Sequence, residues 1–242
     1  TNNGAIAITA YVGPGHAFDL PAQVGVWPVT SLAEGAFRSG SGLPVGNLTR
    51  ITVPDSVTSI GPRAFAGCAN LARVRLPANL TKIDESVLDG CTSLQSVSIP
   101  GHVTNIVQRA FNNCTRLTSI VIPDSVEYVG AFAFGGCAQL ERATIGNGVA
   151  AIADYAFSSC PNLTEVAFGT NLIQLGTSVF SGCRRLGSVT FPGSLNRIGV
   201  TAFESCTNLA SAPINRNLYW LLGGAFRFCT ALETACVPNG VH

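Results

Sequence analysis

Nine cysteines are the most chemically capable residues in this chain of 242 amino acids. Metal sites use cysteines in close pairs such as C-x₂-C, and the chain contains no such pair. Disulfides are the other possibility, but Cys side chains that point in parallel into a core have poor geometry for that bond. We therefore expect buried free thiols that pack as small apolar groups, and they recur every 23 residues at Cys68, Cys91, Cys114, Cys137, Cys160, Cys183, Cys206 and Cys229. Cys236 lies outside this column at an outward position, and we expect it to react with a thiol probe if no partner covers it.

The remaining residues with catalytic potential are few and scattered. The three histidines are His16, His102 and His242, and none forms a readable Ser-His-Asp or Cys-His arrangement. Asp84 and Glu85 are adjacent on a turn and face apart, and no phosphate-binding loop motif is present. We predict that the chain is not an enzyme and that it needs no metal and no cofactor.

The composition excludes two further classes of partner. The net charge is +1, so no overall field attracts nucleic acid. No apolar run approaches the roughly 18 residues of a membrane span. Charged residues make up 11% of the chain and hydrophobic residues 47%, which indicates either little exposed surface per residue or a surface that a partner covers. The chain contains no Met, so we expect Thr1 to be a processed or trimmed end.

Two further columns accompany the cysteines and define a repeat of 23 residues. A Phe, or once Leu88, stands three residues before each Cys, and a Leu stands three residues after it. One unit reads L-x-x-I-x-I-P-x-x-V-x-x-I-x-x-x-A-F-x-x-C-x-x. Eight full units cover residues 48–231, and residues 232–242 form a partial repeat. Residues 1–47 are expected to cap the array, with a degenerate unit ending at Ala36-Phe37 and a Gly/Ser-rich loop over 38–47.

The order of residues within a unit indicates how it folds. In residues 117–122, the last apolar positions alternate as in a short strand. Pro123 ends the strand because it cannot donate a hydrogen bond to a neighbour. One unit cannot bury its own Phe and Cys, so successive units must stack and form a continuous core. The pattern predicts one solenoid with parallel strands.

This unit resembles the BspA-like class of leucine-rich repeats, whose hallmark is a 23-residue unit with I-P after the strand and A-F-x-x-C before the next Leu. The resemblance covers about residues 26–242. It implies a β-dominated leucine-rich-repeat solenoid with a parallel sheet on the concave face and short extended or 3₁₀ segments on the other faces. It also implies a secreted or cell-surface protein that acts as an adhesin or protein-binding module, with an organelle lumen as the alternative compartment.

The repeat register lists the side chains that point outward from the predicted concave face. Arg50, Arg73 and Arg75 lie on the first two strands, and mostly small Ser, Thr and Ala side chains follow them. This basic end predicts a site for an acidic or extended ligand, such as an acidic glycan. The alternative is that these polar side chains only solvate the sheet.

A second candidate surface is aromatic. Phe132 and Tyr155 are one unit apart, before the buried Ala, where other units carry mostly polar residues. Tyr128 and Ile173 are assigned to the adjacent outward column, so we expect an exposed apolar patch of the kind that marks contact surfaces. Tyr219 and Trp220 lie farther along, and they either extend the patch or cap the core at the C-terminal end.

These observations favour non-catalytic binding of another protein, as an interaction module of a secreted or surface protein. One alternative is a permanent structural subunit of a larger assembly, which the low charge and the mean hydropathy of +0.36 favour. A second alternative is glycan binding on the concave face.

Overall fold

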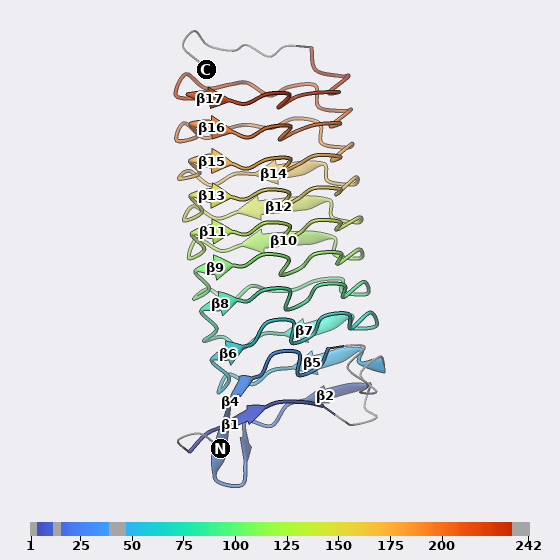
Figure 1. Cartoon of the computed structure of the whole chain (residues 1–242), viewed down its shortest axis with the longest axis vertical. Coiled ribbons are helices and arrows are strands. Elements are labelled where there is room, and N and C mark those ends of the chain that lie inside the picture. The colour runs from blue at the N-terminus through green and yellow to red at the C-terminus, as the bar shows by residue number, and fades with distance from the viewer. Residues whose placement is uncertain (1–3, 12–15, 39–46, 234–242) are drawn as a thin grey trace.

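The computed structural model describes residues 4–11, 16–38 and 47–233 of the chain. Within these ranges the chain winds into a β-solenoid of about 9 turns stacked along one axis (Figure 1). No described residue lies in an α-helix. Each turn has three sides, two of them extended and one built of tight turns. The predicted solenoid of stacked repeats with parallel strands is therefore confirmed.

One side is formed by the strands that begin each predicted unit. They pair in parallel in two groups of three, with Arg50 opposite Arg73 and Ser119 opposite Arg142. Between and beyond these groups, single bridges join Arg73 to Ser96 and Ser188 to Ser211. This is the side predicted to be concave, and we call it the first-strand face. Its strands are β2 (Ala17–Asp19), β5 (Arg50–Thr52), β7 (Arg73–Arg75), β10 (Ser119–Ile122), β12 (Arg142–Ile145) and β14 (Glu165–Ala167).

The second side carries a longer parallel sheet. Here the short extended segments after each Pro turn pair into seven consecutive strands, so the extended segments expected from the repeat form a second sheet. We call this side the second-strand face. Its strands are β8 (Lys82–Ile83), β9 (Asn105–Ile106), β11 (Tyr128–Val129), β13 (Ala151–Ile152), β15 (Gln174–Leu175), β16 (Arg197–Ile198) and β17 (Trp220–Leu221).

The N-terminal segment continues both rows. Strand β2 pairs with β5 on the first-strand face. Strand β4 (Trp27–Leu32) pairs in parallel with β1 (Ile6–Ile8) and β6 (Ser59–Ile60), and antiparallel with β3 (Gln23–Val24). Phe37 is fully buried and stacks on Phe65 with ring centroids 5.2 Å apart. The residues predicted as a degenerate unit thus lie in the ladder of the repeats, and the loop predicted over 38–47 lies mostly outside the described residues.

The third side consists of consecutive tight turns. Backbone N–H groups donate to the carbonyl three residues earlier, as from Ala66 to Arg63 and from Cys68 to Phe65, which is also the pairing of a 3₁₀ segment. Other N–H groups on this side donate to the next turn of the solenoid, as from Phe65 to Val87. The backbone of this side is therefore tied along the chain and along the solenoid axis.

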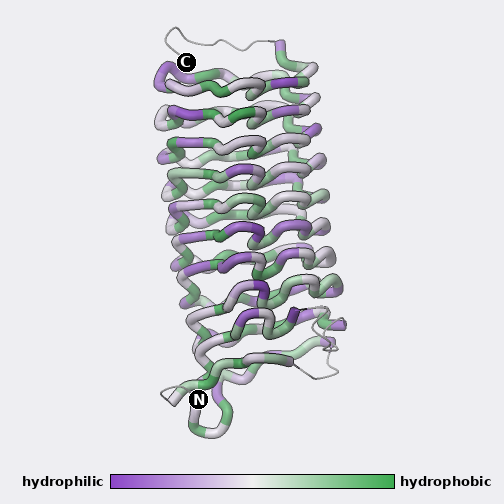
Figure 2. The backbone as a smooth tube through the Cα atoms, in the orientation of Figure 1, coloured by the Kyte–Doolittle hydropathy of each residue, from purple (hydrophilic) through white to green (hydrophobic). Residues whose placement is uncertain are grey.

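Aromatic rings and thiols fill the centre of the solenoid. From Phe111 to Phe226 the rings stack with centroids 5.1–5.4 Å apart between successive turns. In each turn from Cys91 to Cys229, the Cys thiol donates to a backbone carbonyl of the preceding turn at 3.1–3.3 Å. The apolar segments recur at matching places in successive turns, as Figure 2 shows. The predicted core columns are thus confirmed for the described residues.

Candidate functional site

Each turn of the third side carries two residues with a left-handed backbone conformation, and the first of these two columns runs from Arg63 to Gly224. The residues of this column recur every 23 positions, and the seven that are not glycine have φ between 50° and 59°. Glycine and asparagine adopt this conformation readily, whereas bulky side chains rarely do. The column contains Arg63, Ser86, Arg109, Phe132, Tyr155, Ser178, Thr201 and Gly224.

Two neighbouring positions of this column hold aromatic rings. Phe132 and Tyr155 have φ of 56° and 59°, and their rings stack with centroids 4.7 Å apart and planes 7° apart. The guanidinium carbon of Arg109 lies 5.4 Å from the centroid of the Phe132 ring, within cation–π range. We call these three residues the outer aromatic ladder. Tyr155 is 37% exposed, so the ladder presents a ring to solvent at one end.

The other predicted patch residues lie on the neighbouring side. Tyr128 stands on β11 and aligns with Ala151, whereas Ile173 donates its backbone N–H to Ala150, one position earlier in the register. Tyr128 and Ile173 therefore occupy two adjacent columns and not one. Both are exposed, at 42% and 45%.

Tyr219 and Trp220 lie at the C-terminal end of the second-strand face. Their rings meet edge to face with centroids 5.0 Å apart, and they are 52% and 46% exposed. Trp220 aligns with Arg197 in the sheet, on its outward side. Their exposure favours a surface position over a role as a cap on the core.

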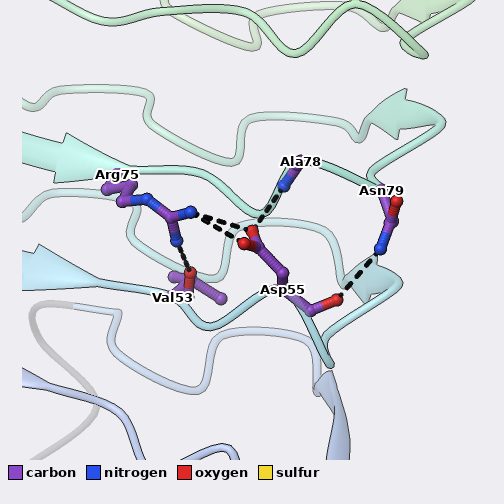
Figure 3. Close-up of polar contacts among 5 residues, drawn as sticks. All are labelled: Val53, Asp55, Arg75, Ala78 and Asn79. Atoms are coloured by element: carbon purple, nitrogen blue, oxygen red, sulfur yellow. Dashed lines mark hydrogen bonds and ion pairs between the residues drawn. The ribbon is translucent and has the colours of Figure 1, made fainter.

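The basic residues of the first-strand face divide into two groups. Arg75 is already bound, because its Nη2 lies 2.8 Å from Oδ2 of Asp55 and its Nη1 donates to the Val53 carbonyl at 3.1 Å (Figure 3). Arg50 and Arg73 are direct neighbours across strands, and neither has an ion pair with another described residue. Like charges directly opposite each other are unfavourable, so these two guanidinium groups remain candidates for an anionic ligand.

Asp55 organises the turn beside Arg75. Its Oδ1 also accepts a hydrogen bond from the backbone N–H of Ala78 at 2.8 Å. The hydrogen bonds from Arg75 and Ala78 lower the pKa of the Asp55 carboxyl below its ordinary value, and the charge of Arg75 adds to this effect. Arg75 therefore holds two turns of the solenoid together, which leaves its guanidinium less available to a ligand than those of Arg50 and Arg73.

The interior of the cysteine column offers no nucleophile, and only at its C-terminal end does a hydrogen bond with the Cys206 thiol lower the pKa of Cys229. The eight thiols of the column are buried and form no disulfide. Burial raises the pKa of Cys160 to about 12, and it raises the pKa of Cys137 and Cys183 well above the ordinary value. A protonated thiol is a poor nucleophile and a poor metal ligand. Among the described residues, no group of three or more His, Cys, Asp or Glu side chains could hold a metal ion, and Cys236 lies outside them.

The sequence did not single out Arg109, Asp154, Gln174 or Arg197, all of which lie beside the predicted aromatic residues. Arg109 is one unit before Phe132, so the 23-residue register places it in the ladder. Asp154, Gln174 and Arg197 line the same surface hollow as Tyr128. The repeat register could have indicated Gln174 and Arg197, because both occupy the same outward position of the second strand as Tyr128. Neither is hydrophobic, so the hydrophobic pattern alone did not indicate them.

Comparison with known proteins agrees with the repeat pattern. The model of the BspA type leucine-rich repeat region matches residues 45–164 and 150–242. The solved structure of the leucine-rich repeat protein TpLRR from T. pallidum is 37% identical, with a TM-score of 0.69 over 76% of this chain and 84% of that one.

A leucine-rich repeat protein from Bacteroides ovatus is 24% identical, with a TM-score of 0.68 over 96% of this chain and 67% of that one. No curated protein matches the chain. Among the described residues, no helix has the length and apolar character needed to cross a membrane. With the family model matched over more than half of its length and the register repeated turn by turn in the structure, the chain belongs to the BspA-type leucine-rich repeat family.

Proposed function

We propose that this chain is a non-catalytic interaction module that binds another protein through the outer aromatic ladder. Repeats of this family are usually interaction modules, and stacked repeats offer an extended surface to a partner. The family resemblance also favours a secreted or cell-surface location. The observation that supports the ladder as the contact is that two successive aromatic residues occupy strained backbone positions on the outside of the solenoid.

The backbone strain is significant because glycine adopts the same conformation at a lower free-energy cost. A left-handed conformation costs a residue other than glycine roughly 1–2 kcal/mol, and Gly224 occupies this column in a later turn. Backbone strain of this kind tends to cluster at functional sites. Stacking between the rings offsets roughly 0.5–1.5 kcal/mol of the cost, so the pair adds little to stability and its presence is better explained by binding.

The chemistry of the ladder suits a protein partner. Aromatic side chains and Arg supply much of the binding energy at protein interfaces. Phe132 and Tyr155 are already fixed by their stacking and by backbone hydrogen bonds to Asp154 and Thr177. Little side-chain entropy is therefore lost when a partner packs against them.

The test is a capture experiment with the full chain in native extract. A photoreactive phenylalanine analogue at position 155 should crosslink one partner in stoichiometric amount, and an analogue at position 73 should not. Phe132→Asn should abolish the crosslink at 155, because Asn tolerates the backbone conformation but removes the ring. Ser159→Asn is the matched control, since Asn113 occupies the equivalent left-handed position two turns earlier.

Crosslinking at position 73 alone would overturn the ladder and favour the first-strand face. In that case the glycan alternative is tested with Arg50→Ala and Arg73→Ala, which should weaken binding of an acidic oligosaccharide. An unchanged isotherm would remove that alternative.

A permanent structural subunit is the second candidate function. The low charge of the chain and its exposed aromatic side chains favour it. A subunit separated from its assembly should aggregate through the exposed patch. Phe132→Ser together with Tyr155→Ser should then raise the solubility of the isolated chain, whereas a free binding module should be monomeric with or without these changes.

A further inference from the structure

A surface hollow of about 340 Å³ lies on the second-strand face beside the outer aromatic ladder. The 23-residue register explains its shape, because each part of the lining is one column of the repeat. The floor is the column of Ala153, Gly176 and Gly199, which leaves almost no side chain above the backbone. One wall is the outward column that contains Tyr128, Gln174 and Arg197, and the other is the column of Ala131, Asp154 and Thr177.

In the middle of the outward column stands Ala151, whose side chain is only a methyl group. Tyr128 aligns with Ala151, Ala151 with Gln174, and Gln174 with Arg197. Parallel strands are roughly 4.8 Å apart, so Tyr128 and Gln174 start roughly 9.6 Å from each other with only the Ala151 methyl between them. Stacked rings need roughly 4.5–7 Å between centroids. Because Ala151 carries only a methyl group, the space between the Tyr128 and Gln174 side chains opens onto the floor of the hollow at Ala153 and Gly176, and one six-membered ring fits there.

Polar groups around this gap have unused hydrogen-bonding capacity. Within the described ranges, the side chains of Tyr128, Gln174 and Arg197 make no hydrogen bond or ion pair. Oδ1 of Asp154 accepts the backbone N–H of Thr177 at 2.7 Å, and its second oxygen faces no described donor. The hollow thus offers an amide, a guanidinium, a phenol and a carboxylate oxygen within four successive turns.

We propose that this hollow binds a neutral saccharide, with one pyranose ring seated on the floor at Ala153 and Gly176, between Tyr128 and Gln174. A pyranose presents a C–H face that packs on an aromatic ring and hydroxyl groups that both donate and accept hydrogen bonds. The charges of Arg197 and Asp154 cancel, which matches a neutral and hydroxyl-rich ligand. The volume lies at the small end of the roughly 300–1,000 Å³ of ligand sites, as one or two sugar residues require.

Two other ligand classes fit less well. An extended peptide binds most readily along an open strand edge, but the seven-stranded sheet is continuous from β8 to β17 through the hollow. An acidic sugar would meet the carboxylate of Asp154. The site goes beyond the proposed protein interface, although it shares Tyr128 with the predicted patch, so its test uses residues that the interface does not contain.

The experiment is isothermal titration of the full chain with four neutral hexasaccharides, built of glucose, mannose, galactose or N-acetylglucosamine. At least one should bind with a dissociation constant below about 1 mM. Ala151→Ile fills the gap above the strand, and Gln174→Ala removes a wall, so each should weaken binding at least about tenfold. Ala167→Ile is the matched control, because Ala167 is an exposed outward residue of β14 on the first-strand face.

Three outcomes would overturn the proposal: no heat with any of the four sugars, unchanged binding by Ala151→Ile, or binding only of a sialylated oligosaccharide. Phe132→Asn separates this site from the protein interface. It should abolish capture of the protein partner and leave the saccharide isotherm unchanged, so failure of one proposal does not depend on the other.

Discussion

The left-handed column shows how one residue position separates folding from binding. In most turns the column holds Arg, Ser, Thr or Gly, and in two successive turns it holds a ring. The rings lie outside the core, so they contribute less to burial than Phe134 or Phe157, which are fully buried. Substitution here should therefore change binding without preventing folding.

Removal of a ring from the ladder tests this separation. We expect Tyr155→Asn to change the free energy of unfolding by less than about 1 kcal/mol, because relief of backbone strain offsets the lost stacking. By contrast, Phe134→Ala should cost about 3–5 kcal/mol. Urea denaturation followed by circular dichroism gives both values, and a loss of several kcal/mol for Tyr155→Asn would show that the ring is structural.

The ion pair of Asp55 with Arg75 predicts a pH dependence. The folded state lowers the pKa of this carboxyl through the hydrogen bonds of Arg75 and Ala78, so its contribution to stability is present above the unfolded pKa. It is lost as the pH falls through the lowered folded value. The melting temperature of wild type should exceed that of Arg75→Met at pH 7, and the difference should shrink towards pH 2–3. A difference that is constant with pH would mean that packing of the Arg75 stem dominates.

Thiol chemistry offers a third measurement at this scale. Because burial raises the pKa of column thiols such as Cys137 and Cys160, they should not react with a disulfide reagent at pH 8 in the folded chain. Cys236, which lies outside the described residues, is predicted to react at once. The expected count in the native state is at most two fast thiols, Cys236 and Cys229, because a hydrogen bond with Cys206 lowers the pKa of Cys229. All nine should react after unfolding. Several fast thiols in native protein would contradict the sealed core.

At the scale of the element, the distance between successive turns decides which positions can hold a side chain. Gly130 lies so close to the preceding turn that an added Cβ would come within 2.6 Å of the Gln108 backbone nitrogen. Gly193 has nothing within 4 Å of an added Cβ. The two glycines therefore have different reasons to be present, one set by a close approach and one not.

This contrast gives a paired prediction. Gly130→Ala should lower the free energy of unfolding by about 1–3 kcal/mol, since two turns must separate to admit the methyl group. Gly193→Ala should be neutral or slightly stabilising, because it only restricts the unfolded chain. Thermal melts of the two variants beside wild type decide the matter, and equal melting temperatures would refute the tight spacing at Gly130.

Seen at the scale of the whole molecule, the columns of Phe, Cys and Leu were predictable because each is one buried position repeated at a fixed interval. Pairing of the second strands was not, since two residues such as Tyr128 and Val129 carry too little alternation to indicate a strand. The positive φ of Phe132 and Tyr155 was also hidden, because neither is a residue type that signals a left-handed turn. Likewise, the sequence placed Arg75 on the outward side but could not show that Asp55, from a turn in the preceding unit, holds it.

The stacked architecture makes one last prediction about how the molecule unfolds. In a solenoid each turn contacts only its neighbours, so the total stability is a sum over turns and the interfaces between them. Phe157 stacks on Phe134 and Phe180, whereas Phe226 stacks on Phe203 near the end of the described chain and is only partly buried. Phe157→Ala should therefore weaken two interfaces and cost about 3–5 kcal/mol, while Phe226→Ala should cost less. Hydrogen exchange read by mass spectrometry should show faster exchange on both sides of residue 157 in the first variant, and only in the last turns in the second. Uniform acceleration over all turns in both variants would mean that the solenoid unfolds as a single cooperative unit in spite of its nearest-neighbour contacts.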